Sequence, residues 1–277
     1  MRVAFVSLET VHHHSSETNQ RFRTVCELLV ERGHDVHCYC TGFWAGDEST
    51  FEHNGVTYHA VATGPEARRS FCLRLPFVLA AATADLSDEP AAREHADAVE
   101  FRMDLAMAPL AALADYDGDL PVIATNRPTW EGGEAADDPA RLDALRTAAE
   151  HEAVGAIDVE LATVEGGAAD RGGEDVVSHA RAHDTAVIVS THDFESTPHR
   201  DQLRALLADA SRAGDVAKLA VTADGPGDVL DVLGATWDAT TAGETVATMA
   251  MGEAGRHSRA VAPLYGSRIG YAPVVPA

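Results

Sequence analysis

The chain has 277 residues and a formal net charge of −23, from 44 acidic and 21 basic side chains. This length accommodates one large α/β domain with a small companion, and the charge argues against nucleic-acid or anionic-membrane binding, both of which need a basic face. No segment approaches the ~18 consecutive apolar residues of a membrane span, and no signal peptide is evident, so we expect a cytoplasmic protein.

The first 75 residues predict a small Rossmann-like β-α-β segment. RVAFVSL and DVHCYCT are typical of buried strands, and a helical pattern separates them. In that helix, RFRTVCELLVERGH, we expect Val25, Leu28 and Leu29 to form the buried face and Gly33 to cap the C-terminus. The Asn-Gly pair in TFEHNGVTYHAVA predicts a β-hairpin.

Composition changes near residue 75. All four cysteines lie before this point, in a segment that contains 9 acidic residues and 7 arginines. Most of the negative charge lies beyond it. We therefore expect two domains, 1–75 and 76–277. The acidic, lysine-poor composition of the second resembles that of halophile proteins, whose surface charge is screened in molar salt.

Eight strand patterns alternate with helical patterns in the second domain. In one expected helix, 198–214, Leu203, Leu206, Leu207 and Ala210 share one face. Strands with helical crossovers in this number predict an α/β (β/α)8 (TIM) barrel, with an open doubly wound sheet as the alternative. The expected strands are 77–84, 96–104, 120–127, 156–162, 185–192, 215–222, 244–251 and 267–274.

Polar residues follow these strands at their C-terminal ends, where (β/α)8 barrels carry their active sites. In VEFRMD, alternation places Glu100, Arg102 and Asp104 on one face. The remaining candidates are Arg127 and Glu131 after the third strand, His192 at the end of the fifth, Lys218 in the sixth and Arg259 after the seventh.

Lys218 is the only lysine in the chain, beside 20 arginines. Arginine serves as well for surface charge, but it cannot lose its proton near neutral pH and attack a carbonyl as an amine. Desolvation in an apolar strand favours the neutral amine of Lys218, and His192 is suited to shuttle protons. The alternatives are a compositional accident at Lys218, a structural role for His192, and a surface ion pair between Arg127 and Glu131.

The blocks ADAVEFRMD, PVIATNRPTWEGG, IDVELA, VIVSTHDFESTP, GDVAKLAV and MGEAGRHSR occur in this order. Over residues 76–274 the chain resembles type I 3-dehydroquinate dehydratases of the shikimate pathway. The resemblance implies a TIM barrel, usually a homodimer, that uses no metal and no other cofactor. It further implies that Lys218 forms a Schiff base with the C3 ketone of 3-dehydroquinate.

The remaining roles also follow from that resemblance. His192 would move a proton from C2 to the departing C1 hydroxyl, giving 3-dehydroshikimate and water, and Glu131 would orient the His192 ring. Glu100, Arg102, Arg127 and Arg259 would bind the hydroxyls and the carboxylate of the substrate.

The chain also departs from the family. It ends at YAPVVPA, whereas family members continue into a Ser/Ala-Pro-Gly-Gln loop and a last helix. We therefore expect a barrel without its last helix, with part of the outer face of its first and last strands exposed. An inactive fusion that keeps the site residues, or a barrel of the class I aldolase type, is the alternative.

Residues 1–80 resemble the start of a group 1 (family 4) glycosyltransferase. The nucleotide-sugar-binding half that should follow is missing, so we expect neither glycosyl transfer nor nucleotide-sugar binding. His12, His13 and His14 are consecutive and cannot all face one ion on regular structure, so we expect them in a solvated loop.

Overall fold

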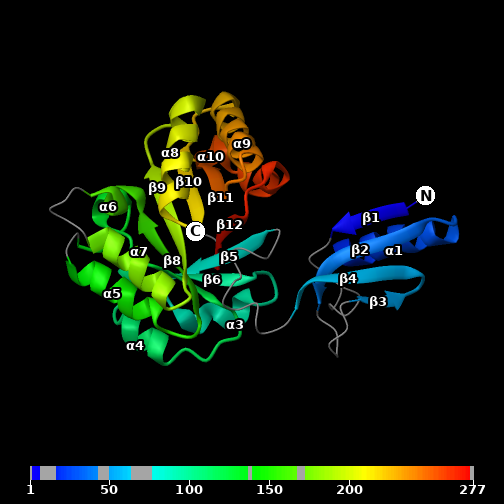
Figure 1. Cartoon of the computed structure of the whole chain (residues 1–277), viewed down its shortest axis with the longest axis horizontal. Coiled ribbons are helices and arrows are strands. Elements are labelled where there is room, and N and C mark those ends of the chain that lie inside the picture. Colours follow the sequence, from blue (N-terminus) through cyan, green and yellow to red (C-terminus); the bar gives the residue numbers. More distant parts are fainter. Residues whose placement is uncertain are drawn as a thin grey trace. The chain divides into compact units, whose positions relative to one another are not determined.

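The computed structural model divides the chain into two compact units, Met1–Ala67 and Arg68–Ala277 (Figure 1). The domain boundary expected near residue 75 lies outside the described residues. None of the described helices is long and apolar enough to cross a membrane. The structure describes residues 2–6, 17–42, 50–63, 77–136, 139–166 and 172–274.

The first unit contains a four-stranded sheet of order β1-β2-β4-β3. Strands β1, β2 and β4 are parallel, and β3 pairs with β4 in the antiparallel direction. Asn54 and Gly55, with φ values of 51° and 76°, form the hairpin turn between β3 and β4, which confirms the Asn-Gly prediction. The elements are β1 (Arg2–Val6), α1 (Glu17–Glu31), β2 (Asp35–Gly42), β3 (Thr50–His53) and β4 (Val56–Thr63).

The buried face of α1 differs from the prediction. Cys26 is fully buried, and Leu29 and Val30 pack beside it, whereas Val25 and Leu28 are 47% and 41% exposed. Consecutive apolar residues allow two overlapping stripes on one helix, and the small, hydrophobic cysteine decides which one is buried. The predicted face was therefore wrong at Val25 and Leu28.

The second unit is a nearly closed barrel of eight parallel strands, in the order β11-β10-β9-β8-β7-β6-β5-β12. The last strand, β12, pairs with the first, β5, and a bridge between Val246 and Ser267 links it towards β11. This order confirms the (β/α)8 barrel, because an open doubly wound sheet would reverse its strand order. The strands are β5 (Val78–Thr83), β6 (Ala98–Arg102), β7 (Val122–Thr125), β8 (Val154–Glu160), β9 (Ala186–Asp193), β10 (Val216–Thr222), β11 (Val246–Met251) and β12 (Ile269–Pro273).

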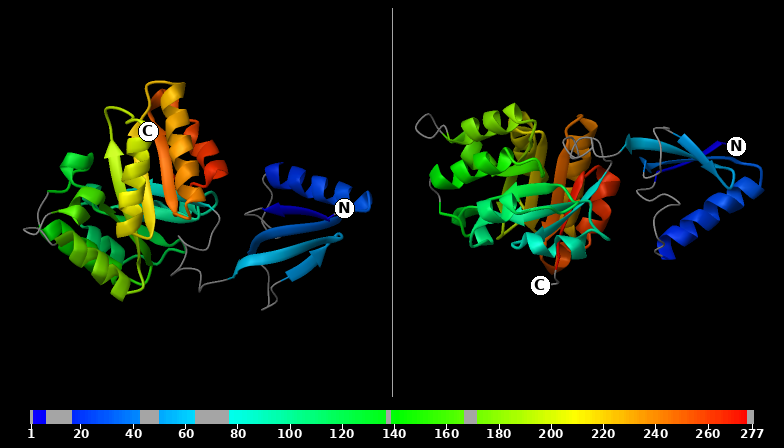
Figure 2. Two further views of the ribbon diagram at one scale, coloured as in Figure 1. Left: turned by 45° about the horizontal axis from the view of Figure 1, so that its top comes forward. Right: turned by 90° about the horizontal axis from the view of Figure 1, so that it is seen from below.

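Helices pack around the outside of these strands (Figure 2). In α8, Leu203, Leu207 and Ala210 are buried and Leu206 is partly buried, as its sequence pattern predicts. On the outer face of β5 and β12, half-buried Phe77 and Leu79 lie close to Gly270. The helices are α3 (Glu89–Ala92), α4 (Pro109–Ala114), α5 (Pro139–Ala149), α6 (Leu161–Glu165), α7 (Gly172–Ala182), α8 (Arg200–Ala213), α9 (Pro226–Thr241), α10 (Gly252–Gly255) and α11 (Ser258–Val261).

Alternation along each strand divides the core into two layers. Outward residues such as Val99 and Phe101 join a large cluster with the helices, and inward residues such as Ala98, Ile123 and Ile188 fill the barrel. Towards the C-terminal ends of the strands, the inward positions become polar. The barrel thus brings its charged side chains together at one end.

Candidate active site

One layer of the barrel interior consists of Glu100, Asp158, Lys218 and Tyr271, from β6, β8, β10 and β12. Alternate strands of a (β/α)8 barrel contribute to the same layer, so residues far apart in sequence come into contact here. All four side chains are buried. Lys218, Glu100 and Tyr271 lie near the middle of their strands, so this layer is inside the barrel, and the C-terminal mouth where such barrels carry their chemistry lies beyond it.

Lys218 lies between two carboxylates and an aromatic ring. Its Nζ donates hydrogen bonds to Oδ2 of Asp158 at 2.7 Å and to Oε1 of Glu100 at 3.2 Å. The centroid of the Tyr271 ring is 4.1 Å from Nζ, within the range of a cation–π contact. The apolar strand therefore supplies burial, with 5% of the side chain exposed, but the amine itself has polar partners.

Arg127 is buried beside two acidic side chains of β8 that point into the barrel. Its guanidinium contacts Oδ1 of Asp158 and Oε1 of Glu160, each at 2.8 Å, and donates to Oγ of Ser190 at 2.7 Å. Glu131 is also buried and lies 3.8 Å from the guanidinium. The interpretation of Arg127 and Glu131 as a surface pair is therefore wrong.

These contacts shift the pKa of Asp158 and of Arg127 away from the values that burial alone would produce. Desolvation would raise the pKa of the Asp158 carboxyl, but the nearby Arg127 and Lys218 cations hold it well below its usual range. Desolvation would likewise lower the pKa of Arg127, and Asp158 and Glu160 raise it instead. The site therefore keeps Asp158 ionised across the whole physiological range.

His192, at the end of β9, is close to Glu131 from the short turn Thr129–Glu131. Oε1 of Glu131 accepts a hydrogen bond from the His192 backbone N–H at 2.7 Å and lies 3.4 Å from its Nδ1. Burial, together with the Arg127 and Lys218 cations, holds the pKa of His192 well below 6.5. The imidazole is therefore neutral at pH 7 and able to accept a proton.

Burial has the opposite effect on the pKa of Glu131. Desolvation raises it to about 7, against the opposing influence of Arg127 and of the His192 backbone hydrogen bond. Glu131 thus exchanges a proton near neutrality within 4 Å of the imidazole, which suits it to position His192 and to respond to its charge.

The other predicted residues lie further from Lys218. Arg102 forms two hydrogen bonds with Asp104, at 2.9 and 2.7 Å. Arg259 lies in α11, beyond the C-terminal end of β11, with its side chain exposed. Within the described part of the chain it does not contact the other candidates.

The sequence prediction missed several residues of this site. Asp158 and Glu160 are inward charged residues of β8, and Arg141 reaches Glu160 from α5 at 2.8 Å. A signal for the first two was present, because IDVE alternates two acids with apolar residues in a buried strand. Arg141 and Tyr271 depend on contacts between distant segments, which no local pattern indicates.

Together these residues provide a buried primary amine, a neutral imidazole within electrostatic range of it and arginine side chains for an anionic ligand. This set is suited to imine chemistry on a carbonyl compound, with proton transfer next to the imine carbon. Within the described ranges, the side chains placed closely enough to share a metal ion are Glu150, His179 and His183, which lie elsewhere in the fold.

Residues 74–276 match the family model described as Type I 3-dehydroquinase. A 3-dehydroquinate dehydratase of Haloarcula marismortui is 62% identical over 201 residues, which cover 73% of this chain and 87% of that protein. One of Halobacterium salinarum is 56% identical, with coverage of 72% and 87%. The 3-dehydroquinate dehydratase structure from Geobacillus kaustophilus superposes with a TM-score of 0.65 at 24% identity, over 82% of this chain and 89% of that one.

Proposed function

The chain belongs to the type I 3-dehydroquinase family, and we propose that Lys218 is the residue that forms its Schiff base. Its function is the dehydration of 3-dehydroquinate to 3-dehydroshikimate and water, a lyase reaction of the shikimate pathway. The observation that carries the assignment is a single buried lysine, held by Asp158 and Glu100 beside a neutral His192.

The first step is imine formation at Lys218. The Lys218 amine passes a proton to the neutral His192 imidazole and attacks the C3 ketone of the substrate. His192 returns that proton to the hydroxyl of the adduct, which leaves as water and gives an iminium ion. Asp158 supports this step because its carboxylate is within hydrogen-bond distance of Nζ and stays ionised. The iminium then acts as an electron sink that acidifies the proton on C2.

The second step is elimination, with His192 as the base. The neutral imidazole takes the C2 proton, and the resulting enamine expels the C1 hydroxyl, which leaves as water once His192 has returned a proton. Hydrolysis of the product imine releases 3-dehydroshikimate and regenerates the amine. Glu131 supports this role because it holds the backbone and contacts the ring of His192.

Substrate binding is assigned to Glu100, Arg102, Arg127 and Arg259. Glu100 lies next to the amine, so it is well placed for a substrate hydroxyl near C3. Arg127 is fully engaged by buried acids, which favours an electrostatic contribution over a large movement towards substrate. The exposed Arg259 side chain is available to bind the substrate carboxylate, because arginine forms bidentate hydrogen bonds with carboxylates.

Turnover of 3-dehydroquinate in molar KCl tests this proposal, with formation of the product enone followed by its ultraviolet absorbance. Lys218→Arg keeps a buried cation between Asp158 and Glu100 but cannot form an imine. Leu219→Met, a volume-conserving change at the next position of β10, controls for disturbance of the strand. We expect the first variant to lose turnover and the second to keep it. Full turnover by Lys218→Arg would disprove the assignment.

A homodimer is also part of the proposal. Leu230 and Trp237 of α9 and the neighbouring Leu264 are 68%, 53% and 79% exposed, which would suit contact with a second copy. Sedimentation of the full chain in molar KCl tests this state. The glycosyltransferase-like origin of the first unit and the location in the cytoplasm stay predictions.

A further inference from the structure

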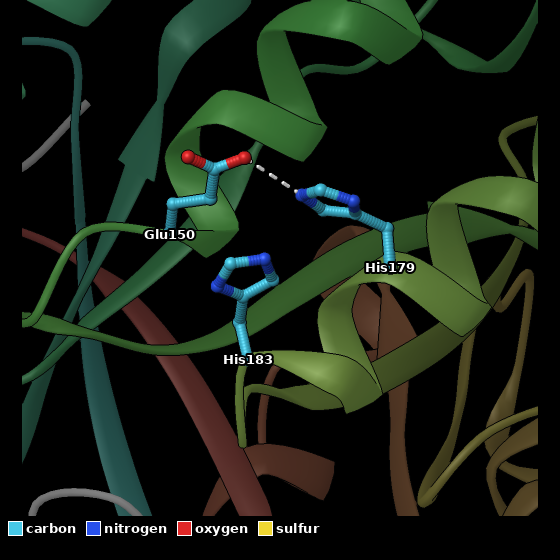
Figure 3. Close-up of side chains that lie close together, drawn as sticks. All are labelled: Glu150, His179 and His183. Atoms are coloured by element: carbon cyan, nitrogen blue, oxygen red, sulfur yellow. Dashed lines mark hydrogen bonds and ion pairs between the residues drawn. The ribbon is translucent and has the colours of Figure 1, made fainter.

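Glu150, His179 and His183 form a cluster that the dehydration reaction does not use. Glu150 follows the end of α5, His179 lies in the last turn of α7, and His183 follows that helix directly (Figure 3). Nε2 of His179 is 2.9 Å from Oε1 of Glu150, and the two imidazole rings are 4.6 Å apart, centre to centre. One ligand atom from each residue lies within 4.8 Å of the others.

We propose that these three residues bind a divalent transition-metal ion of the Zn²⁺ class. Two imidazoles four residues apart, one in the last turn of α7 and one just after it, form with one carboxylate a ligand set that suits zinc and leaves a fourth position for water. A tetrahedral ion with bonds of about 2.0 Å needs ligand atoms about 3.3 Å apart. The 2.9 Å contact between Glu150 and His179 therefore has to open by a few tenths of an ångström, and a pair of ligand atoms at the 4.8 Å limit has to close by about 1.5 Å.

The backbone on both sides of the cluster is already fixed. Oγ1 of Thr185 donates to the carbonyl of Ala149 at 2.8 Å and so ties the end of α5 to the segment that follows α7. The amides of His151 and His183 bond back to Ala148 and Ala180. An ion therefore does not have to order a loose loop, and only side-chain rotations are needed to bind it.

The cluster is accessible to solvent. The side chains of His179 and Glu150 are 30% and 52% exposed, and His183 is exposed as well. An ion can thus enter without opening the fold, and the net negative charge of the protein favours its approach.

The cluster precedes β8 and β9, and is therefore at the N-terminal end of the barrel. His192 is the last residue but one of β9, at the opposite end of the barrel, and Lys218 lies inside β10. The seven residues of β8 alone span roughly 20 Å. This end of a (β/α)8 barrel contributes to stability rather than to catalysis. The ion would cross-link the connections before β8 and β9, and its binding would stabilise the native state without a change in turnover.

The experiment is a calorimetric titration of the full chain with Zn²⁺ in molar KCl. The parent for this test carries His12→Ala, His13→Ala and His14→Ala, so that these consecutive histidines supply no ligands. We expect one equivalent of Zn²⁺ to bind, with affinity reduced more than about 100-fold in His179→Ala and in His183→Ala, because even the loss of a group that only hydrogen-bonds to a metal ligand costs about 10- to 100-fold. Glu150→Gln should weaken binding as well, and Mg²⁺ should not compete.

Two matched variants serve as controls. Glu152→Gln removes an exposed acid next to the cluster, and His95→Ala removes an exposed histidine elsewhere on the barrel, so both should bind Zn²⁺ as the parent does. Zn²⁺ should also raise the Tm of the parent by several degrees and leave the Tm of His179→Ala unchanged. The proposal would be overturned if the folded parent bound no Zn²⁺, or if one equivalent of Zn²⁺ still bound after both His179 and His183 were replaced.

Discussion

Oδ2 of Asp158 lies 2.7 Å from Nζ of Lys218, although 60 residues separate the two in the sequence. The other oxygen of the same carboxylate contacts Arg127 at 2.8 Å and accepts from Ser190 at 2.6 Å. One buried carboxylate thus links the Lys218 amine to the Arg127 guanidinium. We therefore expect Asp158 to position the Lys218 amine.

Asp158→Asn keeps the shape of this side chain and removes its charge. We expect the free energy of unfolding to fall by about 3–5 kcal/mol, because Arg127 and Lys218 lose a buried partner. We expect kcat to fall about 100-fold, since a displaced amine reacts poorly. Denaturation and steady-state kinetics in molar KCl measure both. Asp143→Asn, which removes an exposed carboxylate, should change neither quantity. A parental kcat in Asp158→Asn would show that Asp158 does not position the amine.

His192→Gln separates imine formation from elimination. We expect kcat to fall by about 10²–10⁴-fold, the usual contribution of a general base, while substrate still accumulates as an imine on Lys218. Turnover and the mass of the borohydride-reduced protein measure the two steps. His199→Gln, at an exposed position, is the matched control. Unimpaired turnover in His192→Gln would mean that another group moves the C2 proton.

The raised pKa of Glu131 predicts how stability depends on pH. A folded-state pKa of about 7, against an ordinary 4.5, contributes stability that is fully present below pH 4.5 and is lost as the pH rises through 7. Glu131→Gln cannot ionise. The difference in free energy of unfolding, variant minus parent, should therefore increase by up to about 3 kcal/mol as the pH rises over this interval. Denaturation curves at about pH 4.5 and pH 8 measure the difference. Exposed Glu134→Gln should show none, and a constant difference for Glu131→Gln would contradict the shift.

The net charge of −23 predicts that salt stabilises the fold. At 1 M salt the Debye length is about 3 Å, so repulsion among the surface acids is screened. Surface ion pairs such as Arg200 with Asp238 weaken at the same time, but each contributes under about 1 kcal/mol. We expect Tm to rise as KCl is increased towards molar concentrations. A Tm that falls or stays constant would show that the ion pairs outweigh the net charge.

The strands of the barrel could be predicted from sequence because alternation and buried apolar runs are local patterns. All eight expected strands overlap an observed one. The partners of Lys218 could not be predicted in the same way. Asp158 and Glu100 reach it only because alternate strands share an interior layer, so their contact depends on closure of the sheet.

Local sequence patterns also gave wrong predictions where a buried and an exposed arrangement have the same residue spacing. On α1, the choice between Val25 and Cys26 depends on how the helix packs against its sheet, not on the spacing of apolar residues. Burial of Arg127 was likewise hidden, because an Arg and a Glu four residues apart are typical of a surface pair. The acids of β8 that hold Arg127 lie more than 30 residues further along the chain.

Borohydride trapping detects the proposed Schiff base on Lys218 itself. The full chain is incubated with 3-dehydroquinate in molar KCl, reduced, and analysed by intact mass and peptide mapping, with Lys218→Arg as the control for reaction at the N-terminal amine. We expect one stable adduct per chain, on Lys218, and none in the variant. No adduct from folded protein, or an adduct on the N-terminal amine alone, would contradict it.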